Sequence, residues 1–440
     1  MAPIHDPEVE TRSQAEQFGR DRETYRNQIR MLFERSLFYR EKFRAAGFDD
    51  AEAVGPLDDI GALPFTEKDE IRASQAAHPP LGSHLAAPIG DVVRIFSTSG
   101  TTGAPCYMPL TAADLARWIQ VSSRSYSAGG ARAGYKLVST YGAGPFAAGA
   151  ALEAFNNLGV CHIPVGPGNT ERLARALRVF APEVLACTPS YALYLIEWLA
   201  AAGHDPAGVG LKHLLVAGEP GGGEARIRDR IEGAFGALVT EAMGIGDISI
   251  SVWGECEQRS GMHFCGGDYV HVELIDPESG EPLPWADGAT GELVYTALRR
   301  DAAPLVRFRS RDHVRVWTDP CACGRATPRV RCIGRTDDMI IVRGVNVFPT
   351  AIREVVAEFG PQVSGALVIR PRRKGVRQQP PLPLVVELAE GVAATAALSA
   401  EIAARIRSRL IVTVGVDLVP FGSLPRSDYK IKLVDYSAAE

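Results

Sequence analysis

Ser97 to Pro105 reads S-T-S-G-T-T-G-A-P, and it directly follows the mostly apolar run from Val92 to Phe96. This order predicts a strand that ends in a loop of hydroxyl and glycine residues. A glycine-rich backbone can curl around an anion, and the hydroxyl groups can donate hydrogen bonds to it. No lysine follows the second glycine, which excludes the phosphate loop of P-loop enzymes. By composition alone, the stretch fits an ordinary surface turn as well as a phosphate-binding loop.

Length and composition exclude several classes of protein. A chain of 440 residues is too long for one compact core, so we expect a large domain and a smaller one. With 47 Lys and Arg against 52 Asp and Glu, the formal net charge of -5 argues against nucleic acid as a partner. The N-terminus lacks the order of a signal peptide, and no apolar run approaches the ~18 residues of a membrane span. We therefore expect a cytoplasmic protein that binds no membrane.

Alternating strand-like and helical patterns between residues 115 and 217 predict a parallel sheet covered by helices. Residues 270–316 alternate polar and apolar positions between turns, which predicts the hairpins of a β-rich subdomain. Residues 23–47 predict one or two helices that end at Gly47. A small α+β unit of about 100 residues completes the chain. The predicted fold class is α/β, with a large N-terminal domain of helix-covered, mostly parallel sheets and a smaller α+β C-terminal domain.

Glycine-rich turns follow two of the predicted parallel strands, at residues 141–149 and 218–223. Ligands of parallel sheets bind at the carboxyl ends of the strands, so both turns are candidate binding segments. Tyr141, Phe146 and Ala147 are candidates for the lining of an aromatic pocket there. Packing in the core is the alternative role for each of them.

Cysteine and histidine residues form a candidate metal site. Cys256 precedes His263 by seven positions, and Cys321 and Cys323 occur later in P-C-A-C-G-R. Four nitrogen and sulfur ligands are what a closed, structural zinc site requires. The C-x-C spacing is tighter than the usual C-x-x-C, so buried free thiols are the alternative. Cys265 is a spare candidate ligand.

Several motifs together resemble the phenylacetate-CoA ligase family of the adenylate-forming (acyl-CoA synthetase) superfamily. Besides the S-T-S-G-T-T-G loop, they are F-Y-R-E-K-F, L-P-F-T-E-K-D-E-I-R, T-G-E-L-V-Y-T-A-L, P-L-V-R-F-R-S-R-D and C-I-G-R-T-D-D-M-I-I-V-R-G-V-N-V-F-P. The resemblance implies an adenylation domain at residues 1–335 and a mobile C-terminal domain at residues 336–440, with a hinge at Asp337 and Asp338. It also favours zinc, because many relatives carry E-C, G-L-H and P-C-x-C-G-R at the matching places.

The resemblance implies nucleotide-binding roles for three groups of residues. They are the phosphate loop at Ser99, Gly100, Thr101, Thr102 and Gly103, the adenine turn at Gly218, Glu219 and Pro220, and Gly244 in M-G-I-G-D. Asp312 would bind both ribose hydroxyls, which a carboxylate with two oxygens can do at once. Arg335 would contact the ribose or the phosphates. Arg307 and Arg309 are expected on one side of a strand, with Phe308 packed on the other.

The resemblance also implies which residues are catalytic and which segment faces the second substrate. Asp247 would help to hold magnesium. Lys430 would stabilise the transition state, with Lys432 as the rival candidate, and residues 344–349 would face the thiol-bearing cofactor after the domain rotates. Four positions depart from the family pattern: Ala104 replaces a lysine, Asp247 a glutamate, and Arg311 and Tyr429 replace glycines.

The implied reaction has two steps. A carboxylate attacks the α-phosphorus of ATP, pyrophosphate leaves, and a second nucleophile displaces AMP from the acyl adenylate. The expected substrate is a small aromatic acid and the expected acceptor is coenzyme A, with magnesium, structural zinc and a homodimer also compatible with the family. The departures leave an amine, a carrier protein, or nitrite activation for diazotisation open as alternatives. A non-catalytic nucleotide-binding relative is the last alternative, and the retention of Lys430, Asp312 and Arg335 argues against it.

Overall fold

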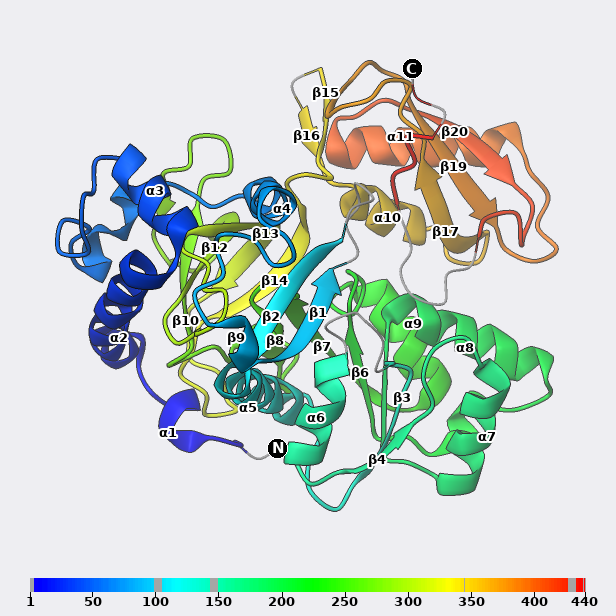
Figure 1. Ribbon diagram of the computed structural model, residues 1–440. Helices are drawn as coiled ribbons and strands as arrows, with labels where there is room; N and C mark the ends of the chain where they lie inside the picture. The colour runs from blue at the N-terminus through cyan, green and yellow to red at the C-terminus, as the bar shows by residue number, and fades with distance from the viewer. Residues whose placement is uncertain are drawn as a thin grey trace.

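The computed structural model describes residues 4–98, 105–142, 149–343, 345–425, 433–437 and 439. The chain forms a large N-terminal part and a smaller C-terminal part (Figure 1). The mixed α/β architecture, with one large sheet in the N-terminal part, confirms the predicted fold class. Within the described ranges, no helix has both the length and the apolar character needed to cross a membrane.

The chain begins with α1 (Pro7–Glu10), α2 (Gln14–Arg35), α3 (Leu37–Ala45), the 3-10 helix η1 (Leu57–Ala62) and α4 (Lys68–Ala77). Ser36 separates α2 from α3, and its side chain caps α3 by accepting a hydrogen bond from the Tyr39 amide. Two helices therefore occupy the predicted helical region, and Gly47 follows them with a φ of +92°. Their buried faces share a core cluster with Leu298 and Val306 of the large sheet region.

One half of a twelve-stranded sheet is parallel, in the order β4-β3-β5-β6-β7. Its strands are β3 (Lys136–Ser139), β4 (Cys161–Pro164), β5 (Val184–Cys187), β6 (His213–Ala217) and β7 (Leu238–Ile245). The connecting helices are α6 (Gly149–Asn157), α7 (Thr170–Phe180), α8 (Pro189–Ala201) and α9 (Ala225–Phe235), with η3 (Pro206–Val209) before β6. This half confirms the predicted alternation of strands and helices.

The other half of the sheet is antiparallel and continues from β7 in the order β8-β9-β14-β13-β12-β10-β11. The strands are β8 (Ser249–Glu255), β9 (Met262–Phe264), β10 (Val270–Ile275), β11 (Pro282–Leu283), β12 (Thr290–Ala297), β13 (Phe308–Trp317) and β14 (Arg329–Arg335). The predicted hairpins are present. They extend the parallel sheet rather than forming a sheet of their own, because β8 pairs with β7.

A separate two-stranded ribbon flanks the predicted phosphate-binding loop. After η2 (Ile89–Asp91), β1 (Val92–Thr98) pairs with β2 (Cys106–Thr111), and α5 (Ala112–Ala128) follows. The predicted strand therefore ends at Thr98, where the glycine-rich loop begins. Trp118 of α5 stacks on Phe96 and donates a 2.7 Å hydrogen bond to the Tyr269 hydroxyl. These contacts anchor the ribbon to the antiparallel half of the sheet.

The C-terminal part has a hydrophobic core of its own, in which Ile340, Ile352, Ile402 and Ile406 are fully buried. Its sheets are β16-β15-β18 and β17-β19-β20, flanked by two helices. The elements are β15 (Ile340–Val342), β16 (Val345–Val347), α10 (Pro349–Ala357), β17 (Val363–Ile369), β18 (Arg377–Gln378), β19 (Leu382–Leu388), α11 (Ala396–Leu410) and β20 (Val414–Val419).

Candidate active site

Asp312 and Arg335 lie opposite one another on neighbouring strands. The antiparallel register pairs Asp312 of β13 with Arg335 at the end of β14. Nη1 of Arg335 donates a hydrogen bond of 3.2 Å to Oδ1 of Asp312. Burial raises the pKa of Asp312, although the charge of Arg335 acts in the opposite direction. Two residues that the sequence analysis assigned to the nucleotide therefore form one charged pair.

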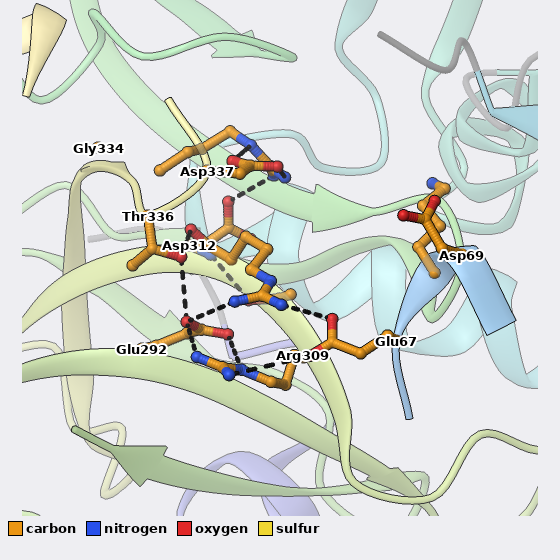
Figure 2. Close-up of polar contacts among 12 residues, drawn as sticks. Glu67, Asp69, Glu292, Arg309, Asp312, Gly334, Thr336 and Asp337 are labelled. Atoms are coloured by element: carbon orange, nitrogen blue, oxygen red, sulfur yellow. Dashed lines mark hydrogen bonds and ion pairs between the residues drawn. The ribbon is translucent and has the colours of Figure 1, made fainter. Parts of the chain in front are cut away.

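The same arginine reaches the predicted hinge. Nε and Nη2 of Arg335 donate to the two carboxylate oxygens of Asp337, at 2.9 and 2.7 Å. Asp337 and Asp338 lie in the turn at residues 336–338, where the chain leaves the large sheet for β15. Figure 2 shows Asp337 beside Asp312. The candidate nucleotide pair and the candidate hinge are thus in direct contact.

Two glutamates hold the arginines around Asp312. Glu292 accepts hydrogen bonds from Nε and Nη2 of Arg309, at 2.9 and 2.8 Å, and from the Thr336 hydroxyl at 3.0 Å (Figure 2). Glu67 accepts a 2.6 Å hydrogen bond from Nη2 of Arg311. Sequence reasoning missed both glutamates. The available signal was their position inside T-E-K-D and T-G-E-L-V, two of the quoted motifs.

Arg307 and Arg309 both face the ring of Phe65, with guanidinium carbons 4.1 and 5.3 Å from the ring centroid. Phe308 is buried in the main core cluster. The two arginines therefore lie over the same ring as predicted, but Arg307, with a φ of +46°, directly precedes β13 instead of lying in it. Arg307 is itself buried and forms a 3.0 Å ion pair with Glu273. Its Nη1 also donates 2.7 Å hydrogen bonds to the carbonyls of Gly61 and Leu63, so it stabilises the segment that leads into α4.

Asp247 is buried in the turn between β7 and β8. Its Oδ2 accepts a 2.7 Å hydrogen bond from Nζ of Lys68, and its backbone carbonyl accepts one from Nη1 of Arg300. Glu67 and Lys68 are neighbours at the start of α4. One side chain contacts the network around Asp312 and the other contacts Asp247, so this helix start connects the two parts of the candidate site.

The predicted adenine-binding turn follows β6 and touches the C-terminal part. Gly218 has a φ of +94°, which favours glycine. Oε1 of Glu219 accepts a 2.8 Å hydrogen bond from the amide of Ser190. The Pro220 carbonyl accepts one of 2.8 Å from Nη2 of Arg353 on α10. The turn is therefore held both by α8 and by a residue of the C-terminal part.

Gly244 allows β7 and β8 to approach closely. A Cβ atom at this position would lie 1.8 Å from the carbonyl oxygen of Ile250. Packing alone therefore demands glycine here, independently of any contact with a nucleotide.

Tyr141 is half-buried after β3. Its ring stacks on Phe155 of α6 with centroids 6.4 Å apart, and its hydroxyl donates a 3.4 Å hydrogen bond to the Cys187 carbonyl. The other predicted residues of the phosphate, acid and catalytic sites lie outside the described residues: Ser99, Gly100, Thr101, Thr102, Gly103, Phe146, Ala147 and Lys430, together with Lys432 and Gly344.

Four side chains with metal-binding atoms lie together: Cys256, His263, Cys321 and Cys323. Their ligand atoms are all within 4.8 Å of one another. The Sγ atoms of Cys256 and Cys321 are 3.7 Å apart, and Sγ of Cys323 is 3.3 Å from Nε2 of His263. Two Zn–S bonds of about 2.3 Å at a tetrahedral angle place their sulfurs about 3.8 Å apart. The donor set and its spacing therefore fit a zinc ion.

Contacts around the cluster also fit a ligating histidine. Nδ1 of His263 lies 3.3 Å from the Thr327 carbonyl, the kind of contact that orients an imidazole whose Nε2 binds a metal. Cys265, the spare candidate, does not join the cluster of described residues. Its Sγ instead lies 3.4 Å from the His263 carbonyl.

Two protein-family models match the chain. The one described as AMP-binding enzyme matches residues 43–297, and the one described as AMP-binding enzyme C-terminal domain matches residues 344–436. Curated phenylacetate-coenzyme A ligases are similar over most of their length. The chain is 35% identical to that of Thermus thermophilus, over 97% of both chains, and 32% identical to that of Escherichia coli, over 91% of this chain and 90% of the relative.

A solved 2-hydroxyisobutyryl-CoA ligase provides two states for comparison. Its postadenylation state, in complex with R3-HIB-AMP, has a TM-score of 0.90 at 29% identity and covers 99% of this chain and 94% of that chain. Its thioesterification state, with 2-HIB-AMP and CoA, has a TM-score of 0.72 at 30% identity and the same coverage. The present domain arrangement therefore matches the postadenylation state better. The chain belongs to the phenylacetate-CoA ligase family of the adenylate-forming superfamily, and it is an AMP-forming ligase.

Proposed function

We propose that the chain activates a small aromatic carboxylic acid with ATP and transfers the acyl group to coenzyme A. The observation that carries this proposal is the pairing of Asp312 with Arg335 directly beside Asp337, in a chain related to phenylacetate-CoA ligases over nearly its full length. A ribose-binding carboxylate next to a hinge suits a reaction in which one site serves two successive steps.

In the proposed first step, the acid carboxylate attacks the α-phosphorus of ATP and pyrophosphate leaves. Asp312 accepts hydrogen bonds from the ribose hydroxyls, and Arg335 orients Asp312 and adds positive charge near the phosphates. The adenine lies against residues 218–220 and Gly244, and the loop from Ser99 to Gly103 holds the β- and γ-phosphates. Phosphoryl transfer of this kind depends on positioning and on cations where charge develops.

The proposed acid pocket lies beyond the end of β3. We assign Tyr141, Phe146 and Ala147 to its lining. The ring of Tyr141 is held by stacking on Phe155, and an aromatic side chain is a suitable packing partner for a flat substrate ring. An aromatic acid is therefore the substrate class that we propose, without a preference among phenylacetates and benzoates.

In the proposed second step, the C-terminal domain, residues 336–440, rotates about Asp337 and Asp338. Lys430 stabilises the charge on the α-phosphate in the first step and leaves with this domain. Residues 344–349 then approach the acyl adenylate, and the CoA thiolate displaces AMP. Rotation requires the ion pair between Arg335 and Asp337 to break or to turn with the hinge.

Magnesium is the metal that we propose beside the phosphates. Carboxylate oxygens are suitable ligands for it. Lys68 binds Oδ2 of Asp247, and within the described residues no hydrogen bond reaches Oδ1. The residues present therefore fit the ion at Oδ1. When bound, magnesium would neutralise phosphate charge, and Lys68 keeps Asp247 in place.

A structural zinc ion at Cys256, His263, Cys321 and Cys323 is a further part of the proposal. Four protein ligands leave no open position for catalysis, so the ion would act on folding alone. Its presence is tested by metal analysis of the purified protein, where less than a stoichiometric amount of zinc would contradict it.

A homodimer and a cytoplasmic location complete the proposal, and both rest on the family resemblance. Light scattering on the purified protein measures the mass directly, and the mass of a single chain would contradict the dimer. Cell fractionation tests the location.

One assay tests the central reaction. The enzyme is incubated with ATP and a panel of aryl acids, with and without CoA, while pyrophosphate, AMP and acyl products are followed by mass spectrometry. We expect acid-dependent pyrophosphate release and an aryl-CoA thioester. Acid-dependent release of pyrophosphate without a CoA thioester would indicate another acceptor, such as an amine or a carrier protein. No turnover with any acid or with nitrite would indicate a nucleotide-binding protein.

The catalytic lysine is tested by two matched variants. Lys430→Ala is expected to abolish acyl-adenylate formation and to leave thioester formation from supplied acyl adenylate largely intact, because the lysine acts on the phosphate in the first step only. Lys432→Ala is the control and is expected to retain both half-reactions. The reverse result would assign the role to Lys432.

A further inference from the structure

An exposed basic segment lies in the C-terminal part, outside the residues assigned to the proposed reaction. Residues 370–377 read R-P-R-R-K-G-V-R, with five basic residues and no acidic one. No Asp or Glu occurs between Glu358 and Glu387. Because the whole chain has a formal net charge of -5, this segment is a local concentration of opposite charge.

Backbone pairing places this segment beside β15. Arg377 pairs with Ile341, and the Ile341 amide donates a 2.7 Å hydrogen bond to the Val376 carbonyl. Nε2 of Gln378 binds the carbonyls of Arg373 and Gly375, at 2.7 and 2.8 Å, which folds the loop onto β18. The loop therefore has a defined backbone path although its side chains are exposed.

Arg343 extends the positive charge to the far end of the same strand. It is exposed and directly follows β15, which spans only three residues, or about 10 Å. We call Arg343, Arg372, Arg373, Lys374 and Arg377 the basic surface.

The cations of the basic surface are unpaired among the described residues. Within the part of the chain that the structure describes, none of its five cations forms an ion pair with a carboxylate, whereas the adjacent Arg370 lies 3.7 Å from Asp435. Other exposed arginines of the C-terminal part are paired, such as Arg405 with Glu358. Isolated surface charges contribute little to stability, but several like charges gathered on one face attract a polyanion.

We propose that the basic surface binds the 3′-phosphate and the diphosphate of coenzyme A. This inference rests on the proposed transfer to CoA. The phosphates lie at the end of CoA opposite to the thiol, so a site for them must be outside the reacting centre but near the path of the pantetheine arm. Guanidinium groups suit phosphate because they donate paired hydrogen bonds to it.

The position of the surface fits the second step. It adjoins the hairpin of β15 and β16, which carries the segment proposed to approach the acyl adenylate after rotation. In the present arrangement α10 faces α9, whereas β15 and β16 lie at the top of the view, away from the parallel half of the sheet (Figure 1). The surface should therefore act on CoA binding and leave the first step unaffected.

The test uses two double variants that remove the same charge. Arg372→Gln with Arg373→Gln changes the basic surface, and the backbone carbonyl that Gln378 binds is retained. Arg172→Gln with Arg175→Gln removes two exposed charges from α7 of the large domain and is the control. Acid-dependent exchange of pyrophosphate into ATP measures the first step. Thioester formation is measured with CoA, dephospho-CoA and pantetheine.

We expect the KM for CoA to rise about tenfold in the basic-surface variant, because charge-assisted phosphate contacts are lost. The KM for pantetheine, which lacks these phosphates, and the rate of pyrophosphate exchange should match those of the control. Added salt should raise the KM for CoA in the unmodified enzyme more than in the variant.

An unchanged KM for CoA, or an equal rise for pantetheine, would overturn this inference alone. If the unmodified enzyme exchanges pyrophosphate but makes a thioester only on a phosphopantetheinyl carrier protein, the inference and the CoA part of the proposed function both fail. If no acid supports exchange, the proposed function fails at its first step, and thioester formation from supplied acyl adenylate still tests the basic surface.

Discussion

Glu241 is a carboxylate whose surroundings oppose its charge. It lies on β7 and is buried near Gly223, whose amide donates to it. Burial, followed by repulsion from Glu255, raises the pKa of Glu241 to about 7, although Arg228 and Arg331 act in the opposite direction. The folded chain therefore holds a proton that the unfolded chain releases near pH 4.5.

This difference predicts how stability depends on pH. Between pH 4.5 and 7 the folded state binds more protons at Glu241 than the unfolded state, so its contribution to the free energy of unfolding falls as pH rises. Glu241→Gln removes the titration and retains an oxygen that can accept from Gly223. We compare the free energy of unfolding of the variant with that of the unmodified protein, measured by urea unfolding. From pH 5 to pH 8 the difference should change by about 2 kcal/mol in favour of the variant. The exposed Glu281→Gln is the control, and a pH-independent difference for Glu241→Gln would contradict the argument.

Gly244 gives a prediction that separates packing from ligand binding. The added Cβ of Gly244→Ala would collide with the Ile250 carbonyl, and backbone atoms cannot rotate away as a flexible side chain can. We expect a loss of at least about 3 kcal/mol in the free energy of unfolding, measured without any ligand. Gly233→Ala on α9 is the control, because a Cβ there meets nothing within 4 Å, and it should be neutral or slightly stabilising. Equal stability of the two variants would contradict this account.

The sequence predicts the role of a residue where a motif assigns it to nucleotide binding. It does not predict the role of a residue that only holds another side chain in place. Asp312 and Arg335 could be named together because both lie in quoted motifs, and they do meet. Glu67 and Glu292 could not be placed beside Arg311 and Arg309, because a partnership across distant strands depends on the completed fold. The same holds for Lys68, which contacts Asp247 across the site.

At the scale of elements, local periodicity identified most strands and helices but not their pairing. The end of β1 and the alternation through α7, α8 and β6 follow from local patterns. That β1 pairs with β2 outside the large sheet, and that β8 joins two half-sheets into one, depends on contacts that no local pattern records. Strand β20, which pairs with β19, was missed although V-G-V-D-L-V contains three β-branched residues, since Gly415 and Asp417 interrupt the apolar run.

The cluster of three cysteines and one histidine joins elements that are distant in the sequence. Cys256 follows β8, His263 lies on β9, and the other two cysteines lie in the connection from β13 to β14. That connection is also fixed by a buried ion pair of Arg325 with Glu10 at 2.5 Å. A metal here would therefore tie β8 and β9 to the irregular connection between β13 and β14.

Loss of one zinc ligand should lower stability without changing the binding of ATP. Cys323→Ser is expected to lower bound zinc well below one ion per chain and to lower the melting temperature, because a structural zinc contributes folding energy directly. At a temperature where the variant stays folded, the KM for ATP should be unchanged. The control is Cys161→Ser, an exposed cysteine outside the cluster. If Cys323→Ser binds as much zinc as the unmodified protein, the cluster is not the zinc site and its cysteines are free thiols.

At the scale of the whole molecule, a few polar contacts hold the C-terminal part in its present place. Arg353 of α10 forms a buried ion pair with Glu224 and also donates to the Pro220 carbonyl. Arg226 and Arg230 of α9 donate 3.0 Å hydrogen bonds to the carbonyls of Ala357 and Ser364. All of these contacts join the two parts of the chain, so the proposed rotation must break them.

Arg353 is therefore expected to favour the first half-reaction over the second. Arg353→Ala leaves Glu224 buried without its partner, so the present arrangement loses stability relative to a rotated one. We expect acid-dependent pyrophosphate exchange to slow about tenfold, while thioester formation from supplied acyl adenylate is unchanged or faster. Glu224→Gln should act in the same direction, and Arg405→Ala, which breaks a pair within the C-terminal part, should not. Small-angle scattering then distinguishes a shifted domain from a damaged site. An equal decline of both half-reactions, with an unchanged scattering profile, would show that Arg353 only supports the adenine turn through Pro220.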